Sequence, residues 1–189
     1  GAQFCIYNDW VKTYDQNDKR LQWFVFNYTD INGNYHNLLD PADQGKAVRC
    51  FKYVPDPAAI SQNNGNDVPV IRYAEVLLNR SEALNEINAL NQESVDLLNQ
   101  IRTRAGVAEY KLSDFHSKDA FRDSILNERG WEFVAEGKRR MDLIRQGQLI
   151  SRAQARGGAS DAKDYMTRYP IPQDEIDANP NLEQNQGYR

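Results

Sequence analysis

Small and apolar positions take up a helical spacing from about residue 67 onward. They recur three or four residues apart, as on the buried face of an amphipathic helix, at Ile71, Ala74, Leu77, Leu78, Ser81, Leu84 and Ile87. Asp67 is expected to cap this helix, with Pro69 in its first turn. The sequence therefore predicts a helix that begins directly after residue 67.

A second helix is predicted between Asn91 and Gly106, where Gly106 supplies the left-handed stop. Two antiparallel helices over about 35 residues match the length of one tetratricopeptide-like repeat. Since one such pair cannot bury its own face, further helices are expected to stack on it. A third helix is predicted from Ser117 to a break at Gly137, and a short fourth one ends near Gly147.

The segments between and before these helices lack the helical spacing. Residues 145–164 are rich in Gly, Ala, Ser and Arg, which predicts an exposed loop. Residues 21–29 (LQWFVFNYT) are aromatic and β-branched enough for a strand buried on both faces, and residues 48–54 (VRCFKYV) predict a second strand. We therefore expect an irregular, partly β lobe over residues 1–66 and a helical region over residues 67–189.

The turn at residues 30–34 (DINGN) begins like a calcium-binding loop. A calcium loop of the EF-hand type needs Gly at its sixth position and Glu at its twelfth, and this chain has Tyr35 and Pro41 there. The segment is therefore predicted to be a hairpin turn rich in Asp and Asn, with no metal.

Bulk properties narrow the class of protein. The net charge is −4 with both signs interspersed, which argues against nucleic acid as a partner, and no apolar run approaches the roughly 20 residues that span a bilayer. Two cysteines, Cys5 and Cys50, leave both a disulfide and two free thiols open. The chain begins with Gly1 rather than Met, and we expect it to be a portion of a longer protein.

The last residues, 169–189, read YPIPQDEIDANPNLEQNQGYR. Three prolines exclude a long helix and a central strand, although residues 174–177 have the composition of a short helical turn. Spaced apolar side chains predict that this extended tail lies folded along a surface.

Several blocks of this chain resemble the SusD/RagB family, in the family's order. They are the tail, RYAEVLL with SEA at residues 72–83, NQIRTRAG at 99–106 and ILNERGWEFVAEGKRRMDL at 125–143. The resemblance covers most of residues 67–189 and is loose in residues 1–66. It implies a mainly α fold: a tetratricopeptide-like scaffold with the irregular, partly β lobe and the extended tail.

The resemblance also implies a function. Members of this family are non-catalytic, lipid-anchored nutrient-binding proteins on the cell surface, at the outer membrane. They deliver glycans, or in some members peptides, to a SusC-like TonB-dependent transporter. The chain would then bind an oligosaccharide or polysaccharide, need no cofactor, and reach the membrane only through an anchor outside this portion.

Glu128, Glu132 and Glu136 are four residues apart and share one helix face. A glycoside hydrolase needs two carboxyl groups about 5–10 Å apart, and Glu128 with Glu132 meet that spacing. The interleaved cations favour a structural ion-pair network between the third and fourth helices instead, through Arg129, Lys138, Arg139, Arg140 and Arg145. Arg102 and Arg104 are expected to pair with Glu82, Glu86 or Asp96.

Sugar binding needs flat aromatic faces and planar polar groups, and the first 66 residues supply both. The candidate ligand-binding residues are Trp23, Asn32, Asn34, Tyr35 and His36. A core role is favoured for Trp23, because buried strands have this composition. Two alternatives stay open: a helical-repeat scaffold for a protein partner, and the hydrolase that uses Glu128 and Glu132.

Overall fold

The computed structural model describes residues 5–40, 42, 47–54, 56–59, 65–156 and 159–188. The chain divides into two compact units, Gly1–Lys138 and Arg139–Arg189. The predicted change from strand-rich to helical chain at residue 67 falls inside the first unit, and residues 139–189 of the predicted helical region form the second unit.

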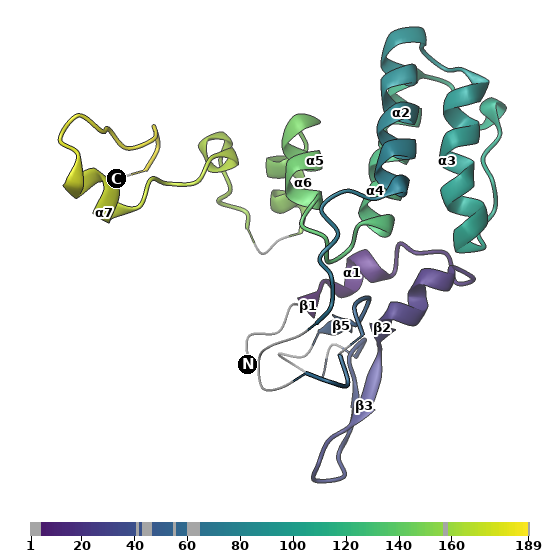
Figure 1. Cartoon of the computed structure of the whole chain (residues 1–189), viewed down its shortest axis with the longest axis horizontal. Helices are drawn as coiled ribbons and strands as arrows, with labels where there is room; N and C mark the ends of the chain where they lie inside the picture. The colour runs from purple at the N-terminus through teal and green to yellow at the C-terminus, as the bar shows by residue number, and fades with distance from the viewer. Residues whose placement is uncertain are drawn as a thin grey trace. The chain divides into compact units, whose positions relative to one another are not determined.

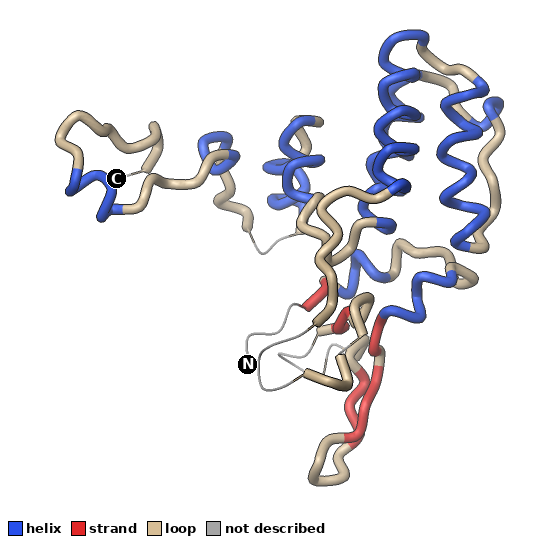
Figure 2. Tube along the Cα trace, in the orientation of Figure 1, coloured by secondary structure: helices blue, strands red, loops and turns tan. Residues whose placement is uncertain are grey.

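The first unit begins with two small antiparallel sheets. One has the strand order β1-β5-β2, and β3 and β4 form a hairpin that projects away from the helices (Figures 1 and 2). The elements are β1 (Cys5–Ile6), α1 (Asn8–Val11), the 3-10 helix η1 (Lys19–Trp23), β2 (Phe24–Val25), β3 (Asn27–Thr29), β4 (Tyr35–Asn37) and β5 (Val48–Cys50).

The prediction of one strand over residues 21–29, buried on both faces, is wrong in two respects. The chain up to Trp23 belongs to η1, because the Asp18 carboxylate accepts a hydrogen bond from the Arg20 backbone N–H (2.9 Å) and caps this turn. The strand is also interrupted at Phe26, whose carbonyl accepts from Leu38 N–H (2.7 Å). The segment therefore passes from one sheet into the other, and the strand predicted over residues 48–54 is likewise limited to β5.

Three longer helices complete the first unit: α2 (Tyr73–Asn88), α3 (Gln92–Ala105) and α4 (Lys118–Glu132), with the 3-10 helix η2 (Leu112–Asp114) between the last two. Figure 1 shows α2 and α3 side by side in opposite directions, and α4 packs against both. Their shared core includes Leu78, Leu98, Phe121 and Ile125, all fully buried. The predicted helical pair with a further helix stacked on it is confirmed.

Most of the predicted helix ends are correct. Asn91 caps α3 by accepting from Ser94 N–H (2.9 Å), Ser117 caps α4 by accepting from Ala120 N–H (3.0 Å), and Gly106 ends α3 with φ 77°. α4 ends at Glu132, before the predicted break at Gly137.

Asp67 is the exception among the caps. The first long helix begins at Tyr73, with Arg72 in extended conformation at its N-cap. Pro69 disfavours helical geometry at Val68, and the Arg72 side chain is held by carboxylates near the end of α4.

A second core lies where the strands meet the end of α4. Val11, Tyr14, Phe24, Leu38 and Val48 pack there with Val134. The Tyr14 hydroxyl donates to the Trp131 carbonyl (3.0 Å) and fixes the segment after α1 against α4. This packing positions the hairpin and η1 relative to the helices.

The second unit contains α5 (Arg139–Arg145), α6 (Leu149–Ala155), the 3-10 helix η3 (Asp164–Thr167) and α7 (Gln173–Ala178). The exposed loop predicted over residues 145–164 is wrong where α6 forms. Alanine is the strongest helix former, and the half-buried Leu149 and Ile150 give this segment an apolar face. Residues 157 and 158 of that prediction lie outside the described residues.

The tail folds back on its own unit, as α7 and the segment after it close a loop. Tyr188 packs edge-on against Tyr165 (ring centroids 4.9 Å apart) and donates its hydroxyl proton to the Arg168 carbonyl (2.7 Å). The Gln184 side chain makes two hydrogen bonds to the Ile171 backbone, of 2.8 and 2.9 Å. The helical turn predicted at residues 174–177 is confirmed within α7.

Candidate functional site

Glu128, Glu132 and Glu136 lie in a buried cluster of charges, not on an accessible surface. Glu128 and Glu132 are 0% and 1% exposed. With their cationic partners Arg20, Lys52, Arg72, Arg102 and Arg104 they form what we call the glutamate cluster.

Both oxygens of Glu128 and Glu132 accept hydrogen bonds. Arg20 Nη1 donates to Glu128 Oε1 (2.7 Å) and Arg102 Nη1 donates to Glu128 Oε2 (3.0 Å). Arg72 Nη1 donates to Glu132 Oε1 (2.5 Å), while Arg104 and Arg20 donate to Glu132 Oε2. A buried carboxylate is tolerable only when it is satisfied in this way.

The cluster confirms that the glutamates make ion pairs, but the predicted partners are wrong. None of Arg129, Lys138, Arg139, Arg140 and Arg145 bonds to the three glutamates. Arg102 and Arg104 likewise pair with the cluster and not with Glu82, Glu86 or Asp96. The partners are distant in sequence, so the cluster joins the strand lobe to α3 and α4.

Charge pairing outweighs burial for two of these carboxyl groups. Burial works against ionisation of Glu132, but the hydrogen bond from Arg104 and the charge of Arg72 hold its pKa below the ordinary value. Burial likewise opposes ionisation of Glu136, and the donors Arg72 and Lys52 lower its pKa. A glycosidase acid needs the opposite, a raised pKa beside bound sugar, so these residues have a structural role.

The turn between β3 and β4 is organised by one carboxylate. Asp30 Oδ1 accepts from the backbone N–H groups of Asn32 and Asn34 (2.9 Å each), and Oδ2 contacts Asn34 Nδ2 (3.1 Å) and His36 Nε2 (3.3 Å). The bonds from Asn34, followed by that from His36, hold the pKa of Asp30 well below its usual range. The predicted Asx-rich hairpin turn is confirmed.

The candidate residues on this hairpin do not share one face. Tyr28 pairs with His36 across the strands and their rings lie 4.9 Å apart. Successive side chains alternate between faces, so Tyr35 points to the other side, where it is 65% exposed. The exposed side chain of Asn32 makes no hydrogen bond within the described residues.

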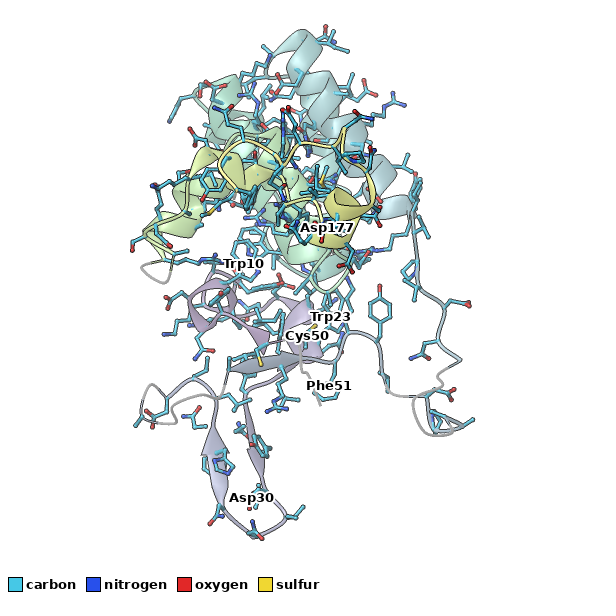
Figure 3. All side chains as sticks on the ribbon, turned by 90° about the vertical axis from the view of Figure 1, so that its left-hand side faces the viewer. Trp10, Trp23, Asp30, Cys50, Phe51 and Asp177 are labelled. Carbon is cyan, nitrogen blue, oxygen red and sulfur yellow. The ribbon has the colours of Figure 1, made fainter. Side chains whose placement is uncertain are left out.

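Trp23 lies apart from the hairpin tip. In Figure 3 it is near Cys50 and Phe51, and Asp30 marks the distant tip. Lys52 Nζ sits 4.3 Å from the centroid of the Trp23 ring, and the same ammonium group donates to the Glu132 carbonyl (2.6 Å). One face of this indole is therefore occupied by the edge of the glutamate cluster.

Metal binding and membrane-spanning helices find no support in the part of the chain that the structure describes. No three His, Cys, Asp or Glu side chains there are grouped to hold a metal ion, and no helix has the length and apolarity to cross a membrane. Neither Cys5 nor Cys50 forms a disulfide, and burial raises the pKa of Cys50.

Sequence reasoning missed Arg20, Lys52 and Arg72 as parts of the glutamate cluster. DKR at residues 18–20 and RCFKY at 49–53 match the family only loosely, whereas RYAE at 72–75 lies in a block that carries the family resemblance. That resemblance was a signal of a constrained position, but only the fold brings these cations to the glutamates.

Comparison with known proteins agrees with this architecture. A family model described as "SusD family" matches residues 3–188. The starch-binding protein SusD of Bacteroides thetaiotaomicron is 30% identical over 175 residues, which cover 86% of this chain and 30% of that protein. The chain thus spans less than a third of this curated relative.

Solved structures give the same result. A SusD superfamily protein from Parabacteroides distasonis superposes with a TM-score of 0.73 at 25% identity, over 97% of this chain and 42% of that one. Surface glycan-binding protein A from Bacteroides thetaiotaomicron, in complex with laminarihexaose, superposes with a TM-score of 0.66 at 28% identity, over 92% and 39%. The mainly helical fold with small N-terminal antiparallel sheets is therefore confirmed.

Proposed function

Because this chain belongs to the SusD family, we propose that it is part of a non-catalytic glycan-binding subunit of a TonB-dependent uptake system. The observation that carries the proposal is the family match over residues 3–188, with relatives that bind starch or carry bound laminarihexaose. The family consists of binding proteins without catalysis, and the buried, fully paired state of Glu128 and Glu132 supports the same assignment here.

The proposed ligand contacts lie at the hairpin tip. Tyr35 offers an exposed ring for the apolar face of a sugar, and the side-chain amide of Asn32 is free for hydroxyl groups. Asn34 and His36 would act mainly by holding the turn through Asp30. Trp23 receives the least support, since Lys52 covers one of its faces.

The assembly and cellular location belong to the same proposal. The partner would be a SusC-like TonB-dependent transporter, and the protein would be a surface lipoprotein of the outer membrane. We keep the division into a strand lobe over residues 1–66 and a helical SusD-like region over residues 67–189 as part of this proposal.

Exposed apolar side chains before and along the start of α2 support a protein-facing surface there: Val68, Val70, Ile71, Tyr73 and Val76.

Tyr35→Ala tests the ligand contacts. Isothermal titration with maltohexaose and laminarihexaose should show saturable binding, and Tyr35→Ala should weaken it about five- to 150-fold, because loss of aromatic stacking costs roughly 1–3 kcal/mol. The matched control is Tyr73→Ala, which removes a tyrosine of similar exposure (71%) on α2. Equal affinities of both variants and the unchanged protein would contradict the hairpin assignment.

The scaffold alternative makes a different prediction. A helical-repeat protein that only binds a protein partner has no affinity for oligosaccharides, and neither tyrosine would then change a titration curve. A glycan array probed with the unchanged chain separates the two, since binding to one polysaccharide class supports the proposed function.

A further inference from the structure

A pocket of about 230 Å³ opens in the first unit, between the segment after α1 and helices α3 and α4. In Figure 1 the segment from α1 to β2 runs beneath the lower ends of these helices. Its lining includes Thr13, Tyr14, Asp15, Arg102, Tyr110 and Trp131. None of these residues is among the ligand contacts proposed above.

The floor of the pocket is rigid and its charges are satisfied. Arg20 is held by both oxygens of Asp18 (2.8–3.1 Å) and by Glu128 (2.7 Å). Tyr14 is fixed by its hydrogen bond to the Trp131 carbonyl. Such preorganisation lowers the entropic cost of binding a ligand.

The rim carries polar groups that the fold does not use. Arg102 donates through Nε to the Ala108 carbonyl (2.7 Å) and through Nη1 to Glu128, and no bond within the described residues uses its Nη2. Among the described residues, Asp15 accepts only from Asn17 N–H (2.8 Å), through Oδ1, so none of them donates to its Oδ2. The Tyr110 hydroxyl also has no hydrogen bond to the described residues, although its ring lies 3.9 Å beneath the Arg102 guanidinium.

Charge and size narrow the class of ligand. Asp18 is paired with Arg20 and Arg102 is paired with Glu128, so Asp15 is the lining charge without an ion pair to the described residues, and an anion would meet its repulsion. The volume is below the roughly 300–1,000 Å³ of pockets that hold drug-sized ligands. Aromatic walls with a carboxylate, a guanidinium and a hydroxyl at the rim suit a neutral ring that carries several hydroxyl groups.

We propose that this pocket is a binding site for a single neutral pyranose unit, separate from the hairpin tip. The sugar ring packs against Trp131 and the edge of Tyr110, since the Arg102 guanidinium covers a face of the Tyr110 ring. Two sugar hydroxyl groups donate to Asp15 and accept from Arg102, and the Tyr110 hydroxyl completes the polar contacts. The inference rests on the proposed function, since it adds a second point of contact for a glycan.

The test is an NMR titration of the full chain with methyl glucopyranoside, methyl galactopyranoside and methyl mannopyranoside. The chain has three tryptophans, Trp10, Trp23 and Trp131, so the indole N–H resonances report on the site. The Trp131 resonance should shift saturably with at least one glycoside, while that of Trp23 should not move.

Two conservative variants complete the test. Asp15→Asn removes the charge of an exposed carboxylate and Tyr110→Phe keeps the ring beneath Arg102, so both are expected to fold. Each variant should weaken the affinity for the glycoside about two- to tenfold, which is the effect of one lost hydrogen bond. Tyr35→Ala should leave this affinity unchanged, and methyl glucuronide should bind more weakly than methyl glucoside.

The outcomes separate this inference from the proposed function. Failure of every glycoside to shift Trp131, or a shift insensitive to both variants, overturns the pocket even when the hexaoses bind through Tyr35. Tighter binding of the glucuronide overturns the assignment to a neutral sugar. A shift of Trp131 without hexaose binding supports the pocket and counts against the oligosaccharide function.

Discussion

Arg20 shows how single residues hold the interior of the first unit together. It is 3% exposed and bonds to Asp18 on its own segment and to Glu128 and Glu132 on α4. Removing one partner of a buried ion pair leaves an uncompensated charge, which costs more than the pair itself contributes.

Arg20→Met is therefore expected to destabilise the protein by about 3–5 kcal/mol. The measurement is urea unfolding followed by tryptophan fluorescence, because all three tryptophans lie in the first unit. Arg80→Met is the control, since Arg80 pairs with Glu93 at an exposed site and such pairs contribute about 0–1 kcal/mol. Equal losses of unfolding free energy in the two variants would contradict the role assigned to the glutamate cluster.

The same carboxylates predict an acid-sensitive stability. The pKa values of Glu132 and Glu136 are lower in the folded protein than their ordinary value of 4.5. At pH values below about 4.5 the unfolded chain then binds more protons than the folded one, so the free energy of unfolding decreases as the pH is lowered. We expect little change in the free energy of unfolding between about pH 7 and 5 and a steep loss below. Urea unfolding across this range checks the expectation, and an unchanged stability at about pH 3 would contradict it.

At this scale the sequence predicted the kind of interaction but not the partners. Three glutamates on one helix face indicated ion pairs, and the nearest cations along the chain were the natural choice. The true partners Arg20, Lys52 and Arg72 lie 60 or more positions away, as the separation of 60 between Arg72 and Glu132 illustrates. Sequence distance carries no information on such contacts, since they depend on tertiary packing.

At the scale of helices and strands, short signals with a local mechanism were reliable. The helices that were predicted to begin at Asn91 and Ser117 do so, because each of these side chains caps its helix by accepting from a backbone N–H three residues on. The cap predicted at Asp67 is wrong although the local pattern was similar. Pro69 disfavours helical geometry directly after Asp67, and the Arg72 side chain is bound by Glu132 and Glu136. The helix α6 was missed because an Ala- and Arg-rich segment beside glycines resembles a loop in composition.

The closed tail of the second unit depends on one glycine. Gly187 has φ 97°, and a Cβ at this position would overlap the ring of Tyr165. Gly147→Ala is the matched control, since Gly147 has φ 65° and open space around it.

Gly187→Ala should release the packing of Tyr188 on Tyr165, whereas Gly147→Ala should cost only the roughly 1 kcal/mol of left-handed strain. Limited proteolysis checks this by measuring the rate of cleavage within about the last 20 residues, because an ordered tail resists cleavage. Equal cleavage rates in both variants would contradict a tail closed by this contact.

At the scale of the whole molecule, the helical architecture and family were predictable from the sequence. The helical period gave the α2–α3 pair and α4, and the motif blocks gave the family. The proposed ligand contacts were not predictable to the same degree. The fold decides whether a side chain is exposed on a hairpin and which side chains line one pocket. Tyr35 and His36 therefore appeared equivalent in sequence although they point to opposite faces.

The central claim is that this chain binds a glycan without cleaving it. The most direct measurement is isothermal titration with maltohexaose, laminarihexaose and the glycans selected on an array, followed by assay of the recovered samples for new reducing ends. We predict saturable binding to at least one glycan, weakened by Tyr35→Ala, with no new reducing ends. The absence of binding to every glycan, or the release of reducing ends, would contradict the claim.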